Sequence, residues 1–137
     1  MISAPGDQKK ASDIAIDAVE QLNLVLKPHG HSLSTVHWKN NISTGRGKRA
    51  QEVINDQTHD CDAITAIIGP RAGTPTGDFE SGTIEEIERF LSRKTTNSVD
   101  YDVHVFFNNA EVDPLTLDVD QLKSVQKYRK SLTERGV

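Results

Sequence analysis

A long loop that leads into an acidic helix start is the segment of this sequence best suited to chemistry. Thirteen residues separate Gly69 from Thr83, and Glu85 and Glu86 follow at the start of the next helical pattern. Connections of this length in compact domains are usually functional, because a few residues suffice to join a strand to a helix. We therefore expect a carboxylate of this helix start to face a cleft.

The same residues also fit structural roles. Thr83 and Glu86 have the spacing of a capping box, in which the glutamate side chain bonds the backbone at the helix start. Ser81 is either a ribose or substrate contact or a solvated loop residue. Arg71 can bind a phosphate or pair with a neighbouring carboxylate. The residue types alone leave these alternatives open.

A second candidate is the turn near the start of the chain, from Ser3 to Asp7 through Pro5 and Gly6. Asp7 is expected to cap the helix that follows, since aspartate is a favoured N-cap residue. Backbone N–H groups at a helix start can also bind a phosphate, but one glycine is far from a G-x-G-x-x-G fingerprint. Both uses of the turn remain open.

Hydrophobic periodicity predicts the elements that must position these segments. Apolar residues at three- and four-residue steps between Ala11 and Leu26 predict an amphipathic helix with one buried stripe, ending near Pro28 and Gly30. The continuous apolar run over residues 61–69 is typical of a central parallel strand. Further strands are predicted at residues 1–3, 32–38 and 101–107, further helices at residues 49–57, 83–93 and 118–134, and an exposed loop at residues 39–48.

This alternation of strands and helices predicts the fold class. It indicates a doubly wound, mostly parallel α/β sheet of four to five strands with helices on both faces. Ligands of such sheets bind beyond the carboxyl ends of the strands. The loops at residues 3–7, 39–48 and 69–82 are therefore expected to meet at one site.

Composition limits the classes of function. The 137 residues, 35% of them hydrophobic, predict a single domain over residues 1–137. Sixteen Lys and Arg against 20 Asp and Glu give a net charge of −4, which disfavours a nucleic-acid partner. The single cysteine excludes a disulfide scaffold and a zinc ribbon, and no metal site is expected. No run approaches the ~18 apolar residues of a membrane helix, so no membrane partner is expected. The single cysteine favours a reducing, cytoplasmic location.

Several segments together resemble the TIR-like domains of bacterial defence and signalling proteins. The resemblance is greatest to the domain of unknown function that often precedes NACHT or repeat regions. Its most specific matches are Gly73-Thr74-Pro75-Thr76-Gly77 and Ser81-Gly82-Thr83, with others at residues 2–7, 51–55, 62–69, 85–87, 106–107 and 120–125. Relatives usually continue into another strand and helix, so a missing last strand and helix and an exposed sheet edge are expected.

The resemblance implies a flavodoxin-like fold and, as in active members of the wider group, cleavage of NAD between nicotinamide and ribose. The matching catalytic glutamate is Glu86, with Glu85 as the fallback. NAD is then the substrate and no cofactor is expected. The nucleotide-binding residues would be Ser3, Pro5, Gly6, Asp7, Arg71, Thr74 and Ser81, with Arg46 as a second cation.

Two other functions stay open. One is a non-catalytic module that assembles with its own copies or with a partner. The other is an enzyme similar to nucleoside deoxyribosyltransferases, which also use a glutamate at a helix start. In the NAD-cleaving alternative, self-association or a fused sensor domain is expected to switch on the activity.

Overall fold

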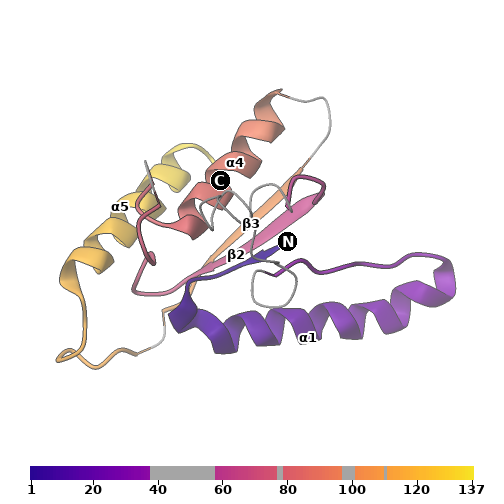
Figure 1. The fold of residues 1–137 in the computed structure, drawn as a ribbon, viewed down its shortest axis with the longest axis horizontal. Coiled ribbons are helices and arrows are strands. Elements are labelled where there is room, and N and C mark those ends of the chain that lie inside the picture. The colour runs from indigo at the N-terminus through magenta and orange to yellow at the C-terminus, as the bar shows by residue number, and fades with distance from the viewer. Residues whose placement is uncertain (38–57, 77–78, 97–100, 110) are drawn as a thin grey trace, which may run out of the picture.

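Three parallel strands form an open sheet in the computed structural model, which describes residues 1–37, 58–76, 79–96, 101–109 and 111–137 (Figure 1). Their order in the sheet is β1 (Ile2–Ser3), β2 (Ala63–Ile68) and β3 (Asp102–Phe107). The described part of the chain is thus an α/β structure with a parallel sheet. It holds three strands where the sequence predicts four to five.

Strand β2 is the centre of this sheet, as its continuous apolar run predicts. It pairs with β3 over six residues, from Ala63 opposite Asp102 to Ile68 opposite Phe107. On its other side it pairs with the two residues of β1, Ser3 lying opposite Ala66. The carboxyl ends of the three strands therefore lie along one edge.

The helices lie on both sides of the sheet (Figure 1). Helix α1 (Lys9–Leu26) lies on one side, and helices α4 (Gly82–Thr96) and α5 (Val119–Glu134) lie on the other. The predicted helices at residues 83–93 and 118–134 are confirmed. Asp118 caps α5 by accepting hydrogen bonds from the backbone N–H groups of Asp120 and Gln121.

The hydrophobic core lies between β2 and the pair α4 and α5. On the β2 side it contains Ile64, Ala66 and Ile68, which are almost completely buried. The helices and the loop before α4 contribute Ala72, Ile84, Ile87, Phe90 and Val125. This layer fixes the position of α4 relative to the end of β2, where the long loop begins.

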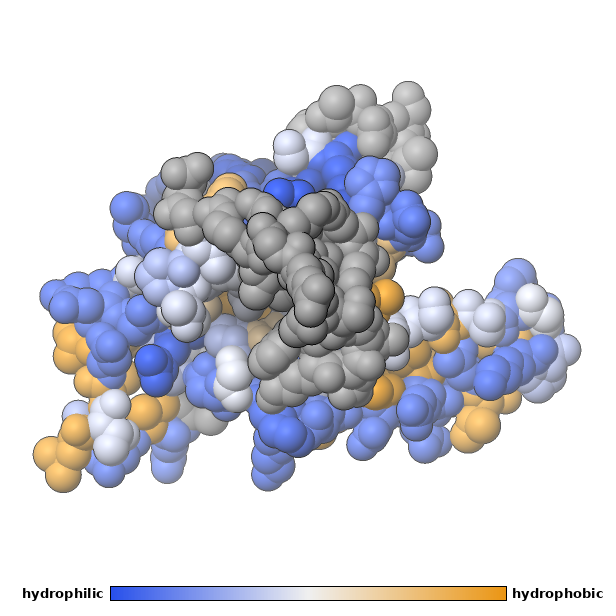
Figure 2. Space-filling view, in the orientation of Figure 1, coloured by the Kyte–Doolittle hydropathy of each residue, from blue (hydrophilic) through white to orange (hydrophobic). Residues whose placement is uncertain are grey.

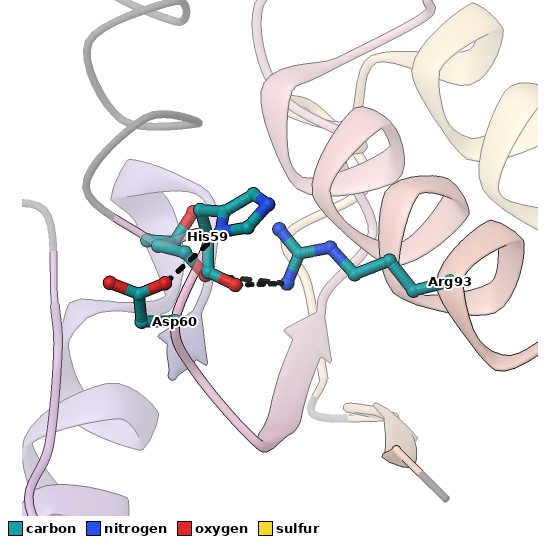
Figure 3. A network of polar contacts seen from close by, with 4 residues as sticks. His59, Asp60 and Arg93 are labelled. Atoms are coloured by element: carbon teal, nitrogen blue, oxygen red, sulfur yellow. Dashed lines mark hydrogen bonds and ion pairs between the residues drawn. The ribbon is translucent and has the colours of Figure 1, made fainter. Parts of the chain in front are cut away.

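Arg93 ties the turn before β2 to α4 (Figure 3). Its guanidinium donates to the backbone carbonyl of His59 at 3.0 Å, and the imidazole of His59 lies 3.0 Å from the carboxylate of Asp60. The same guanidinium lies over the ring of Phe90, 4.8 Å from its centroid. Arg93 therefore links the entry of β2 to the core by both polar and cation–π contacts.

The structure does not bury the stripe predicted for α1. Ser12 is buried, whereas Ile14 and Val25 are 60% and 64% exposed. The first half of the helix faces Thr65 and Ile67 of the sheet, and the second half extends past it (Figure 1). Apolar side chains accordingly alternate with polar ones on the surface of α1 at the right of Figure 2. The helix has 18 residues and is about 27 Å long, whereas the neighbouring edge strand β1 has two residues, so the sheet covers only part of the helix.

Two further predictions near the chain start are wrong. Asp7 does not cap α1, because residues Gly6–Gln8 form a 3₁₀ turn, η1, and the helix begins two residues later. Residues 32–37, the described part of the strand predicted at 32–38, form no strand, although the Ile2 N–H of β1 donates to the Val36 carbonyl at 2.9 Å. Trp38, the predicted loop with Arg46, the predicted helix at residues 49–57 and the resemblance at 51–55 lie outside the described residues. No helix within the described ranges is long and apolar enough to cross a membrane.

Glu88 joins α4 to α5. Its carboxylate accepts hydrogen bonds from Tyr128 at 2.8 Å and from Arg135 at 2.8 and 3.0 Å. Burial raises the pKa of the Glu88 carboxyl, but the hydrogen bonds from Arg135 and Tyr128 outweigh it and hold that pKa below its ordinary value of 4.5. The charged form of Glu88 therefore stabilises the contact between the two helices.

Replacing Glu88 by Gln should lower the free energy of unfolding by roughly 1 kcal/mol at about pH 7, after allowance for its partial exposure. Because folding lowers the pKa of Glu88, this stabilisation is complete at a pH above the ordinary pKa of 4.5. It is lost as the pH falls through the pKa of the folded protein. Urea unfolding of both proteins between about pH 7 and pH 3 measures it. Glu134→Gln, at an exposed pair with Lys130, is the control and should change little. An equal difference at both pH values would contradict the role of the Glu88 charge.

Candidate active site

A cavity of about 370 Å³ lies at the carboxyl edge of β1 and β2. Three segments line it: residues 4–7 after β1, residues 71–74 and 76 after β2, and residues 81–83 and 86 at the start of α4. We call it the Glu86 hollow. It occupies the position at which α/β sheets bind ligands, because the strand ends leave the loops to form the walls.

Most residues predicted from the sequence meet in this cavity. The predicted residues that line it are Pro5, Gly6, Asp7, Arg71, Thr74, Ser81 and Glu86. Ser3 lies at the end of β1 and reaches the cavity through its bond to Glu86. The structure thus brings the turn after β1 to the start of α4, and the bonded pair Ser3 and Glu86 is 83 residues apart in the chain.

The centre of the site is a buried contact between Ser3 and Glu86. The hydroxyl of Ser3 donates a hydrogen bond to Oε2 of the Glu86 carboxylate. The two residues are only 1% and 6% exposed. A carboxylate removed from water needs such donors, and a serine at the end of β1 supplies one. The contact orients the carboxylate at the wall of the cavity.

The capping-box role predicted for Glu86 is wrong. Helix α4 begins at Gly82, and the Oγ of Ser81 accepts the hydrogen bond from the backbone N–H of Ile84 at 3.1 Å. Ser81 is therefore the capping residue, and Glu86 lies two positions beyond the place that a capping glutamate occupies. The sequence analysis does not predict this role of Ser81, which follows from the start of the helix at Gly82.

Glu85, the fallback, has a different task. Its Oε2 accepts a hydrogen bond from the hydroxyl of Thr76 at 2.8 Å, and its Oε1 lies 3.5 Å from Nε of Arg89. Its side chain does not line the Glu86 hollow. Glu85 therefore anchors the loop after β2 to α4, while the next residue faces the cavity.

A glutamine of α5 holds the wall formed by the loop. Oε1 of Gln121 accepts hydrogen bonds from the backbone N–H groups of Ala72 at 3.0 Å and Gly73 at 3.4 Å. Gly73 has a φ of +115°, which disfavours any residue with a Cβ atom. Sequence reasoning missed the role of Gln121, although its place in the first turn of a predicted helix indicates a residue near the strand ends.

A second polar link, also missed, joins the first wall to β3. Gln8 donates to Asp7 Oδ2 at 2.9 Å and accepts from the side-chain amide of Asn108, just after β3, at 2.8 Å. The side chain crosses directly over Gly69, where a Cβ would lie only 2.0 Å from Gln8 Nε2. Because Gly69 has no Cβ atom, the Gln8 side chain can pass over it and bind the Asp7 carboxylate in the wall of the Glu86 hollow.

The arrangement suits a ligand with an anionic part and a part that develops positive charge. Arg71 and the starts of η1 and α4 supply positive charge and backbone donors around the cavity. Glu86 and Asp7 supply carboxylates on the same surface. Among the described residues, no three His, Cys, Asp or Glu side chains are placed to hold a metal ion.

None of the protein-family models, curated proteins or solved structures compared with the chain matches it.

Replacing Ser81 by Ala should lower the free energy of unfolding by about 1 kcal/mol, because Ile84 N–H loses its acceptor at a buried helix start. Urea unfolding followed by circular dichroism measures this loss. Ser34→Ala, at an exposed serine outside any helix, is the control and should stay within about 0.5 kcal/mol of the original protein. Equal stabilities of the two variants would contradict the capping role of Ser81.

Proposed function

We propose that this chain cleaves the N-glycosidic bond of NAD and releases nicotinamide, with Glu86 as the catalytic carboxylate. The observation that carries the proposal is the Glu86 side chain, which is buried, bonded to Ser3 and part of the cavity wall. The cavity lies at the strand ends, where a nucleotide site is expected in this class of fold.

One carboxylate suffices for this reaction. The nicotinamide of NAD carries a positive charge while attached to the ribose, so it leaves as a neutral molecule without a general acid. The electron pair of the C–N bond goes to nicotinamide, and positive charge develops on the ribose. Glu86 stabilises that charge. Water then bonds to the ribose carbon and loses a proton, which completes hydrolysis to ADP-ribose.

The remaining residues of the Glu86 hollow suit the rest of the substrate. Arg71 and the backbone N–H groups of Gly6 and Asp7 are donors for the diphosphate. The Asp7 carboxylate and the hydroxyls of Thr74 and Ser81 are partners for ribose hydroxyls. All five residues line the same cavity as Glu86.

The proposal places the chain among TIR-like domains of bacterial defence and signalling proteins. The support is the set of sequence segments that resemble this family, together with a parallel α/β sheet. A flavodoxin-like, doubly wound sheet of four to five strands and a cytoplasmic location belong to the proposal. So does activation by self-association or by a fused sensor domain.

Replacing Glu86 by Gln should lower the rate of nicotinamide release from NAD at least about 100-fold, because the neutral amide does not stabilise the developing cation. Chromatography of the reaction products at high protein concentration measures the rate. Glu80→Gln is the control, since Glu80 is exposed and does not line the cavity, and its activity should be unchanged.

Each other result of that experiment has a definite meaning. Release that is unaffected by Glu86→Gln would overturn the site. Transfer of the ribosyl group to an added free base would favour an enzyme similar to nucleoside deoxyribosyltransferases. No release from the original protein, even when sedimentation shows it to be self-associated, would favour the non-catalytic assembly module.

Replacing Ser3 by Ala should lower kcat for NAD about tenfold or more with little change in KM, because the carboxylate loses the donor that orients it. Steady-state kinetics of nicotinamide release measure both constants. Ser34→Ala, at an exposed serine that does not line the Glu86 hollow, is the control. A raised KM with unchanged kcat would instead show that Ser3 binds the substrate directly.

A further inference from the structure

A second cavity of about 370 Å³ lies at the same edge of the sheet, beyond the ends of β2 and β3. Three parts of the chain form its walls. They are residues 69–70 after β2, residues 107–109, 112 and 117 at and after the end of β3, and Leu122, Val125, Gln126 and Arg129 of α5. We call it the Arg129 hollow. The reaction proposed for Glu86 leaves it without a role.

The two cavities are direct neighbours. Pro70 lines the Arg129 hollow and Arg71, the next residue, lines the Glu86 hollow. Consecutive Cα atoms are only about 3.8 Å apart. Within α5, Gln121 holds the wall of the Glu86 hollow and Leu122 lines the Arg129 hollow. The walls of the two cavities therefore adjoin at the loop after β2 and at the first turn of α5.

The linings of the two cavities differ in chemistry. The Glu86 hollow carries carboxylates and a cation, which suit a ribose and a phosphate. The Arg129 hollow carries Val112, Leu117 and Leu122, which suit the faces of an aromatic base. The side-chain amides of Asn109 and Gln126 lie in the same wall, and amides both donate and accept along the edge of a base.

Arg129 adds a planar cation to this wall. Its guanidinium carbon lies 5.3 Å from the centroid of the Phe107 ring, in a cation–π contact. Guanidinium groups stack on aromatic bases and bind phosphates. Arg129 on α5 lines the Arg129 hollow and Arg71 on the loop after β2 lines the Glu86 hollow, so each cavity has one arginine in its wall.

Resting on the proposed function, we infer that the Arg129 hollow binds the purine nucleoside half of a dinucleotide whose ribosyl half lies in the Glu86 hollow. The substrate class is then a dinucleotide rather than a nucleoside or a mononucleotide. The diphosphate crosses the ridge formed by Pro70 and Arg71.

The test compares two ligands that have no nicotinamide–ribose bond, so the proposed reaction does not consume them. ADP-ribose carries both halves, and ribose 5-phosphate lacks the purine nucleoside. NMR titration of the unmodified protein should show that ADP-ribose binds at least tenfold more tightly. Val112→Trp places a bulky side chain in the Arg129 hollow from an exposed loop. It should lower the affinity for ADP-ribose at least tenfold and leave the affinity for ribose 5-phosphate unchanged.

Leu115→Trp is the matched control, because Leu115 is 94% exposed in the same loop and lines neither cavity. It should change neither affinity. Gln126→Ala should lower the affinity for ADP-ribose severalfold. Lys127→Ala, at the next residue of α5, should not, because Lys127 lines neither cavity. This second pair tests the same cavity without adding a bulky side chain.

Three results would overturn the inference: equal affinity of the unmodified protein for both ligands, no binding of ADP-ribose, or a loss in Val112→Trp that is equal for both ligands or absent. These results are independent of catalysis. The proposed function is judged separately, by nicotinamide release from NAD and its loss in Glu86→Gln.

Discussion

The hydrogen bond between Ser3 and Glu86 is the contact on which the candidate site depends. A carboxylate that is 6% exposed is costly to bury without donors, and the Ser3 hydroxyl at the end of β1 provides one. The bond forms only if β1 pairs in parallel with β2 and α4 packs on β2, because these contacts bring the end of β1 to the first turns of α4.

Side-chain amides hold the loops around this contact. Gln121 binds two backbone N–H groups of the loop after β2, and Gln8 joins Asp7 to Asn108. Each amide links elements that the sheet alone leaves apart. A long loop with Gly73 at a φ of +115° would otherwise have many conformations, so these links preorganise the cavity wall.

Much of the fold follows from the sequence, and the exceptions share a cause. The run over residues 61–69 predicts β2 because both faces of a central strand are apolar. The helical periodicity of apolar residues over 83–93 and 118–134 predicts α4 and α5. The same periodicity wrongly predicts a buried stripe on α1, since periodicity reports one apolar face and says nothing of how long a surface covers it. The strand expected at residues 32–38 is not formed over its described part, residues 32–37, where the Val36 carbonyl accepts a hydrogen bond from Ile2 of β1.

The sequence by itself determined which residues are available to the site: a long loop, an acidic helix start, Arg71 and the turn at Ser3 to Asp7. The tertiary structure decided what each one does. Ser81 rather than Thr83 caps α4, Glu85 binds Thr76, and Glu86 binds Ser3. Two adjacent glutamates have the same local chemistry, but successive helical residues point about 100° apart. Their roles therefore depend on what packs against each face of the helix, which sequence spacing does not specify.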